Sequence, residues 1–100
     1  DAKYENIIEI DASSIPPMIA KPHTVDNVAP VQDIQGKKFH QGLIGTCTNG
    51  RNEDLEAAAK ILKGKKIHPD IRLLVLPASW SVYREALNKG VIDTLIDAGA

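Results

Sequence analysis

The sequence has 100 residues, 43% of them hydrophobic and 25% charged, a composition typical of one soluble globular unit. Its 12 Lys and Arg against 13 Asp and Glu leave a formal charge of -1, so the basic field that attracts nucleic acid or anionic lipid is missing. No run approaches the ~20 apolar residues needed to cross a bilayer, and no secretory signal pattern is present. We therefore expect no nucleic-acid or membrane partner and a cytoplasmic location.

The first 38 residues predict a strand followed by an irregular connector. Tyr4 to Asp11 is a short run with three isoleucines, which favours a strand. Ala12 to Lys38 holds four of the six prolines, and proline removes a donor from any strand ladder. We interpret residues 1–38 as an N-terminal strand and proline-rich connector. Because long loops without secondary structure are uncommon inside compact domains, the connector is expected either to be functional or to bridge two domains of a larger protein.

Strand and helix patterns alternate in residues 39–100. Phe39 to Gly45 and Ile71 to Leu76 predict strands, the second covered on both faces. A helix between them is predicted with Asn52 as its N-cap and Gly64 after its last turn. Its inward stripe has the spacing i, i+3, i+4 and i+7: Leu55, Ala58, Ala59 and Leu62.

Two shorter helices are predicted over 81–88 and 91–97. Trp80, before the first, is expected to be a packed aromatic, with an exposed contact residue as the alternative. The residues expected to face inward on these helices are Val82, Tyr83, Ala86, Leu87, Ile92, Leu95 and Ile96. The element order predicts an α/β fold with parallel strands. Two parallel strands do not form a sheet that is stable alone, so partner strands are expected outside this chain.

The segment Gly45 to Arg51 is the candidate site, because ligands of α/β sheets collect beyond the carboxyl ends of the strands. It contains the single cysteine, Cys47, which cannot form an internal disulfide. A cysteine beside a helix N-terminus is favoured as a thiolate, which suits a nucleophile or a soft metal ligand. The competing interpretation is an inert cysteine buried in the core.

Three kinds of site remain open on the residues alone. Gly45 to Asn52 has the glycine spacing of a phosphate loop but lacks its lysine and its magnesium-binding hydroxyl. A nucleophilic Cys–His pair could form with His23, His40 or His68. A metal centre would need further ligands, since zinc and iron–sulfur sites take three or four.

Several segments resemble, in the same order, the aconitase superfamily, in particular the large subunits of 3-isopropylmalate dehydratase and homoaconitase. The segments are KPHTVDNVAPV, GTCTNGRNEDLEAAAKILKGKK, LPAS, VYREAL and GVIDTLIDAGA, and together they cover nearly the whole chain. Thr46 is a departure, because members commonly have serine there. The resemblance implies a three-layer α/β/α domain with parallel strands, of which residues 39–100 would be part of the third domain of the subunit.

The resemblance also implies the chemistry. In this family three cysteines hold a 4Fe–4S cluster, and Cys47 matches the first of them. The other two form a downstream C-x-x-C pair that this sequence lacks. Thr46, Thr48 and Asn49 are candidates for hydrogen bonds to cluster sulfurs. No catalytic residue and no substrate-binding residue can be carried over.

The function implied is that of a hydro-lyase that isomerises a hydroxy-acid by dehydration and rehydration, in leucine or lysine biosynthesis. Its expected partners are a small (swivel-domain) subunit and a small-molecule hydroxy-acid substrate. The chain begins with Asp1 and lacks the second cysteine motif, so we expect a fragment that is inactive and holds no cluster by itself. The alternatives are a free-standing α/β binding or scaffold module with an inert core cysteine, and a fragment ordered by self-association through its strand edges.

Overall fold

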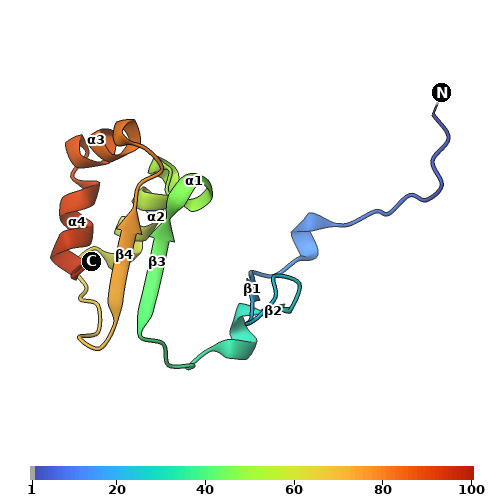
Figure 1. Cartoon of the computed structure of the whole chain (residues 1–100), viewed down its shortest axis with the longest axis horizontal. Coiled ribbons are helices and arrows are strands. Elements are labelled where there is room, and N and C mark those ends of the chain that lie inside the picture. The colour runs from blue at the N-terminus through green and yellow to red at the C-terminus, as the bar shows by residue number, and fades with distance from the viewer. Residues whose placement is uncertain (1) are drawn as a thin grey trace. The chain divides into compact units, whose positions relative to one another are not determined.

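The computed structural model of the protein describes residues 2–100, which form two compact units divided between Lys37 and Lys38 (Figure 1). Each unit has its own secondary structure. No helix within residues 2–100 is long and apolar enough to cross a membrane.

The first unit is built on a short hairpin. Strand β1 (Met18–Ala20) pairs antiparallel with β2 (Val28–Pro30), between the 3-10 helices η1 (Ala12–Ser14) and η2 (Val31–Ile34). The prediction of a wholly irregular connector was therefore wrong. Pro30 is the last residue of β2, where proline is tolerated because its missing N–H costs a donor only at the end of the strand ladder.

The predicted strand over residues 4–11 does not form. This segment has neither helix nor strand, and its three isoleucine side chains are exposed by 72–83%. A strand is stabilised by its neighbours in a sheet, and no described residue pairs with this segment. The apolar run alone was an insufficient signal.

The second unit contains a parallel strand pair and four helices. Strand β3 (Gln41–Gly45) pairs with β4 (Arg72–Leu76) in the register Gln41↔Arg72 to Gly45↔Leu76. The four helices are α1 (Thr46–Asn49), α2 (Asn52–Leu62), α3 (Trp80–Asn88) and α4 (Val91–Ala98). The parallel α/β arrangement predicted for residues 39–100 is confirmed.

The core of this unit lies where α2, α3 and α4 meet one face of the strand pair. Its buried members are Leu55, Ala59, Ala86, Val91, Ile92 and Leu95. The strand residues Ile44 and Val75, which are register partners, pack against this cluster. The other face is open, since Leu43 and Leu76 are 55% and 44% exposed. Strand β4 is thus covered on one face within the described residues, and the expected covering of both faces is absent.

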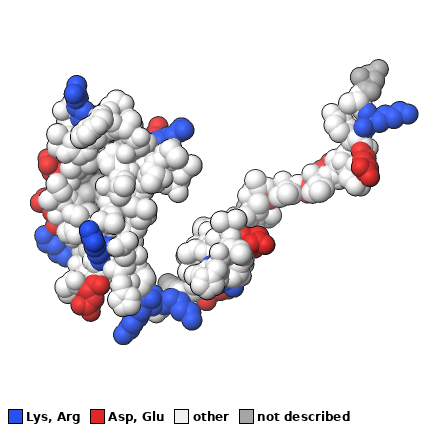
Figure 2. Space-filling view, in the orientation of Figure 1, with Lys and Arg blue, Asp and Glu red and all other residues white. Residues whose placement is uncertain are grey.

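The sequence predicted the inward-facing side chains of α2 correctly, but it predicted too many inward-facing side chains on α3 and α4. The stripe on α2 faces the core as expected. On the other two helices Ile96 is 60% exposed, Leu87 42% and Tyr83 36%, so these predictions of inward side chains were wrong. Each lies at the margin of an apolar stripe, where the neighbouring elements decide what is covered. Most of the face of residues 38–100 in Figure 2 is uncharged, with charged side chains mainly around its margin.

Local signals set the helix ends. The Ser79 hydroxyl accepts the Val82 N–H at 3.3 Å and caps α3. Helix α2 starts one residue earlier than predicted, with Arg51 as N-cap, because the Asp54 carboxylate accepts the Arg51 N–H at 3.0 Å. Gly64 follows α2 with a φ of 72°, as a left-handed residue after a helix should.

Candidate functional site

The candidate site lies at the carboxyl ends of the two parallel strands. Gly45, the last residue of β3, is opposite Leu76, the last residue of β4. Helix α1 follows β3 without an intervening loop, and residues 77–79 lead from β4 into α3 (Figure 1). In open α/β sheets this edge is where ligands bind.

Cys47 is exposed on α1, a helix of one turn. The prediction placed this thiol in a loop before a long helix, but α1 separates it from α2. Four residues form almost no macrodipole, so the expected help from a helix N-terminus is absent. The exposure also contradicts the alternative of an inert core cysteine. The thiol is open to whatever approaches the strand ends.

The turn into α1 has an unusual backbone. Thr46 has a φ of 68° and Gly45 a φ of 153°. A left-handed conformation costs a residue with a Cβ roughly 1–2 kcal/mol, and Gly50, at the end of the same turn, lies close against the Thr46 backbone. The side chains of Thr46, Thr48 and Asn49 are exposed and make no hydrogen bond to any of residues 2–100.

Gly45 and Gly50 allow the turn to pack closely against Leu76 at the end of β4. A Cβ on Gly45 would lie 2.9 Å from the Leu76 Cβ, and one on Gly50 would lie 2.5 Å from the Leu76 carbonyl oxygen. Both distances are too short for real atoms, so the close approach requires glycine at each position. The Gly50 carbonyl accepts the Ala78 N–H at 2.8 Å. The segment that carries Cys47 is therefore held against the loop that follows β4.

Helices α2 and α3 are joined by charged side chains. Lys89 Nζ lies 2.7 Å from Glu85 Oε1 and 2.9 Å from Glu56 Oε1. The hydrogen bond from Lys89 lowers the pKa of the Glu85 carboxyl, and the same bond raises the pKa of the Lys89 ammonium. These groups are exposed, so the network orients side chains more than it stabilises the fold.

The first residue of α2 holds an unpaired buried atom. The Asn52 Oδ1 atom is buried and accepts no hydrogen bond from residues 2–100. After Lys89, the Asn52 side chain makes a smaller contribution to the lowered pKa of the Glu85 carboxyl. The sequence pattern predicted this asparagine as the N-cap of the helix. Arg51 is the N-cap instead, and Asn52 is the first residue of α2.

The histidines do not assemble with the cysteine. His40 precedes β3 and His68 lies in the turn before β4, where its Nδ1 accepts the Asp70 N–H at 3.2 Å. Both are at the amino ends of the strands, opposite the edge that carries Cys47, and His23 belongs to the first unit. A nucleophilic pair of Cys47 with His40 or His68 is therefore excluded by topology.

The phosphate-loop alternative also fails on geometry. Such a loop wraps the anion with free backbone N–H groups ahead of a long helix. Here α1 occupies the middle of that segment, and Gly50 is buried against Leu76 instead of facing a ligand.

Among residues 2–100, the side chains at this edge offer one ligand to a metal centre, the thiol of Cys47. Residues 2–100 contain no group of three or more His, Cys, Asp or Glu side chains that could hold a metal ion. Cys47 presents one exposed sulfur with uncharged polar neighbours, and cysteine thiolates are the usual ligands of iron–sulfur clusters. Residues 39–100 can thus supply one ligand and no complete site.

Comparison with known proteins identifies the family. Residues 29–100 match the Aconitase family, described as aconitate hydratase. The chain belongs to the aconitase family. The match includes α1 and Cys47, and the resemblance inferred from the GTCTNG motif is confirmed.

Several relatives in this family match almost the entire chain. The sequence is 52% identical over 99% of its length to 3-isopropylmalate dehydratase large subunit 2 of Archaeoglobus fulgidus. It is 51% identical over its full length to the 3-isopropylmalate dehydratase large subunit of Moorella thermoacetica, and 47% identical to the methanogen homoaconitase large subunit of Methanocaldococcus jannaschii. In each case the chain spans 24% of the relative's length.

The aconitase-family chain has one surface feature at this edge that the sequence did not predict. Trp80, the first residue of α3, is 84% exposed, and its ring meets that of Tyr83 edge to face, with centroids 5.9 Å apart. The favoured expectation of a packed aromatic was wrong, and the alternative of an exposed residue is the one observed. The only sequence signal for the exposure of Trp80 was its position directly after the Ser79 N-cap. The first residue of a helix lies at its end, where fewer neighbouring elements cover it.

Proposed function

We propose that the chain is part of the large subunit of an iron–sulfur hydro-lyase of the 3-isopropylmalate dehydratase or homoaconitase type. Such an enzyme isomerises a hydroxy-acid by dehydration and rehydration, in leucine or lysine biosynthesis. The names of the relatives and their identity over the full chain support this proposal. The structural observation that carries it is the exposed Cys47 thiol, held at the carboxyl ends of the parallel strands.

Cys47 would hold one corner of a 4Fe–4S cluster. Two further thiolates come, in this proposal, from a C-x-x-C pair that is absent from residues 1–100. When bound, the cluster supplies a Lewis acid to the substrate hydroxyl through the iron that lacks a cysteine ligand. In this proposal the residues of this chain fix the position of one sulfur, and hydroxyl or amide groups of Thr46, Thr48 and Asn49, its neighbours on α1, would hydrogen-bond around the cluster.

The placement of the turn explains how the chain would fix that sulfur. The left-handed Thr46 and the contacts of Gly45 and Gly50 with Leu76 leave α1 little freedom to move away from β4. The Gly50–Ala78 hydrogen bond adds a second connection between the two loops. A ligand held in this way loses little conformational entropy when the cluster binds.

In the complete protein we place residues 39–100 in the third domain, a three-layer α/β/α unit whose remaining strands extend the β3–β4 pair. Residues 1–38 would lead into it. The partner of this subunit is a small (swivel-domain) subunit, as expected for a protein similar to those called large subunits. Residues 1–100 as an isolated polypeptide would have no activity.

The decisive experiment replaces Cys47 by Ser in the full-length large subunit, assembled with its small subunit. After anaerobic reconstitution, we expect the bound iron and the dehydratase rate to fall by more than the ~10–100-fold that follows the loss of a partner outside the ligand set. Iron content and the rate of 3-isopropylmalate isomerisation are the measurements.

Ile61→Ala on α2 is the matched control, because this side chain is 64% exposed and distant in sequence from the turn. It should leave both quantities unchanged. Full iron content and full rate in Cys47→Ser would refute the cluster assignment.

A further inference from the structure

Among the asparagines of the chain, Asn49 is the only one that a glycine follows. The residues after the other four are Ile7, Val28, Glu53 and Lys89. Asparagine is a thermolabile residue, because the next backbone nitrogen can attack its side-chain carbonyl carbon and expel the amide. A side chain on the next residue obstructs that attack, and glycine has none. The Asn49–Gly50 pair therefore has the highest intrinsic reactivity of the five.

The Asn49 side chain is open to solvent. It belongs to the last residue of α1, it is exposed, and it makes no hydrogen bond to residues 2–100. Helix α1 is a single turn of four residues, and so short a helix has little stability of its own because nucleation is costly. Neither the side chain nor the helix itself therefore protects this amide strongly.

The protection comes from the contacts of Gly50. In a helix ψ is about −42°, and Asn49 must leave this conformation before the Gly50 nitrogen can approach its Cγ. Gly50 is buried so closely that a Cβ on it would lie 2.5 Å from the Leu76 carbonyl oxygen. Its own carbonyl accepts the Ala78 N–H at 2.8 Å. The end of α1 cannot unwind while these contacts are intact.

We propose that Asn49 is a deamidation site whose rate is set by opening of the contact between Gly50 and Leu76. In the open turn the Gly50 nitrogen attacks Asn49 Cγ, and the new N–C bond closes a succinimide ring. The Cγ–Nδ2 bond breaks, and ammonia leaves with the proton of the Gly50 amide. Water then opens the ring at either carbonyl, which gives aspartate or isoaspartate without any oxidant or reductant. This inference goes beyond the proposed function and does not depend on it.

The modification would alter the segment that carries Cys47. Either product replaces a neutral amide with a carboxylate two residues from this thiol. Isoaspartate also routes the main chain through Cβ and Cγ, which adds one backbone atom before Gly50. Because Gly50 has no room even for a Cβ beside Leu76, the lengthened backbone cannot keep the contact that holds the turn.

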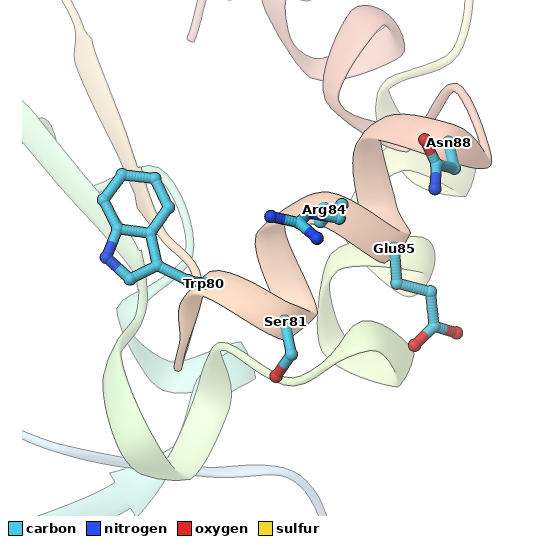
Figure 3. Close-up of a pocket in the computed structure, with 5 residues that line it drawn as sticks. All are labelled: Trp80, Ser81, Arg84, Glu85 and Asn88. Atoms are coloured by element: carbon cyan, nitrogen blue, oxygen red, sulfur yellow. The ribbon is translucent and has the colours of Figure 1, made fainter.

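The test follows deamidation of each asparagine by site-resolved mass spectrometry in the full-length large subunit at neutral pH. Asn88 is the matched internal control, since it is exposed, is the last residue of α3 and is followed by Lys89 (Figure 3). Asn49 should deamidate at least about tenfold faster than Asn88, because glycine leaves the attacking nitrogen unobstructed. It should react more slowly than in a peptide of residues 45–52, which has no contact with Leu76.

Gly45→Ala opens the turn without changing the reacting pair. Its Cβ would lie 2.9 Å from the Leu76 Cβ, so the turn must move away from β4. The deamidation rate of Asn49 should rise about 5–150-fold, with the rate of the peptide as its ceiling, because overpacking of this kind destabilises the contact. Gly42→Ala is the control, because its methyl group meets only flexible side chains, and Asn49 should then react at the wild-type rate.

A second measurement on the wild-type subunit needs no variant. The ratio of the deamidation rate in the peptide to that in the protein should match, within about tenfold, the protection of the Ala78 amide against hydrogen exchange. Deamidation of Asn49 no faster than that of Asn88 would overturn the site. A rate equal to that of the peptide, or unequal to the Ala78 protection, would overturn its control by the Leu76 contact. No readout involves iron or substrate, so these outcomes leave the proposed function untouched.

Discussion

Leu76 is the residue against which the candidate site is built. Its backbone and Cβ fill the space that side chains on Gly45 and Gly50 would need. Gly50 has a φ of -119°, which any residue can adopt, so its requirement for glycine is a matter of space alone. The contact couples the end of β4 to the turn that carries Cys47.

Replacing Gly50 by Ala should loosen this turn. The new methyl group would lie 2.5 Å from the Leu76 carbonyl oxygen and 2.6 Å from that of Thr46, and backbone atoms cannot easily retreat. Overpacking of this kind costs about 1–3 kcal/mol. Hydrogen exchange of the Ala78 amide, which bonds to Gly50, should therefore become about 5–150-fold faster in the full-length protein.

Gly42→Ala on β3 is the control for this prediction. Its methyl group would meet the Leu73 Cδ1 at 3.1 Å, and that flexible side chain can move. The Ala78 amide should exchange at the wild-type rate in this variant. Equal effects of the two substitutions would show that the Leu76 contact does not hold the turn.

At the scale of elements, helix α2 connects the site to the core. It begins two residues after the buried Gly50 and packs against α3, α4 and β3. Leu55 on its inner face is fully buried and belongs to the same cluster as Leu95 of α4. The position of the turn before α2 therefore depends on packing around Leu55.

Leu55→Ala should leave a cavity in this cluster and destabilise the unit by about 2–5 kcal/mol. The measurement is the free energy of opening from hydrogen exchange of α2 and α4 amides in the full-length protein. Ile61→Ala on the same helix removes an exposed side chain and should change that free energy by no more than about 0.5 kcal/mol. If both substitutions had small effects, α2 would not be anchored through Leu55.

At the scale of the whole molecule, apolar and strand-edge surfaces remain open. The β3–β4 pair has no third strand among residues 2–100, and Leu43, Trp80 and Ile96 are all more than half exposed. Unpaired strand edges and apolar patches are the surfaces through which chains associate. In the complete protein we expect other segments of the large subunit to cover them.

The isolated 100-residue polypeptide should therefore self-associate and show no dehydratase activity. Static light scattering over a concentration series should give a mass that rises above that of one chain, whereas the full-length subunit should keep a constant mass. A polypeptide that stayed monomeric, with slow hydrogen exchange in β3 and β4, would contradict the prediction that these edges need partners.

The sequence by itself determined the parts of this protein that depend on local periods and local chemistry. The stripe of Leu55, Ala58, Ala59 and Leu62 identified α2 and its inner face, the apolar runs identified β3 and β4, and the GTCTNG motif indicated the family. These signals are local because a helical period, a strand pattern and a short motif each lie within about ten residues of chain.

The tertiary structure decided everything that depends on neighbours distant in sequence. From the sequence, Ile96 was predicted to face the core and Trp80 was favoured as a packed aromatic, but both side chains are exposed. The isoleucine run at residues 4–11 forms no strand because no described residue pairs with it. Likewise, Cys47 could have been a core filler or a surface thiol on its sequence alone. The contacts of Gly45 and Gly50 with Leu76, about thirty residues away, place it at the surface, since burial is a property of packed elements and not of single residues.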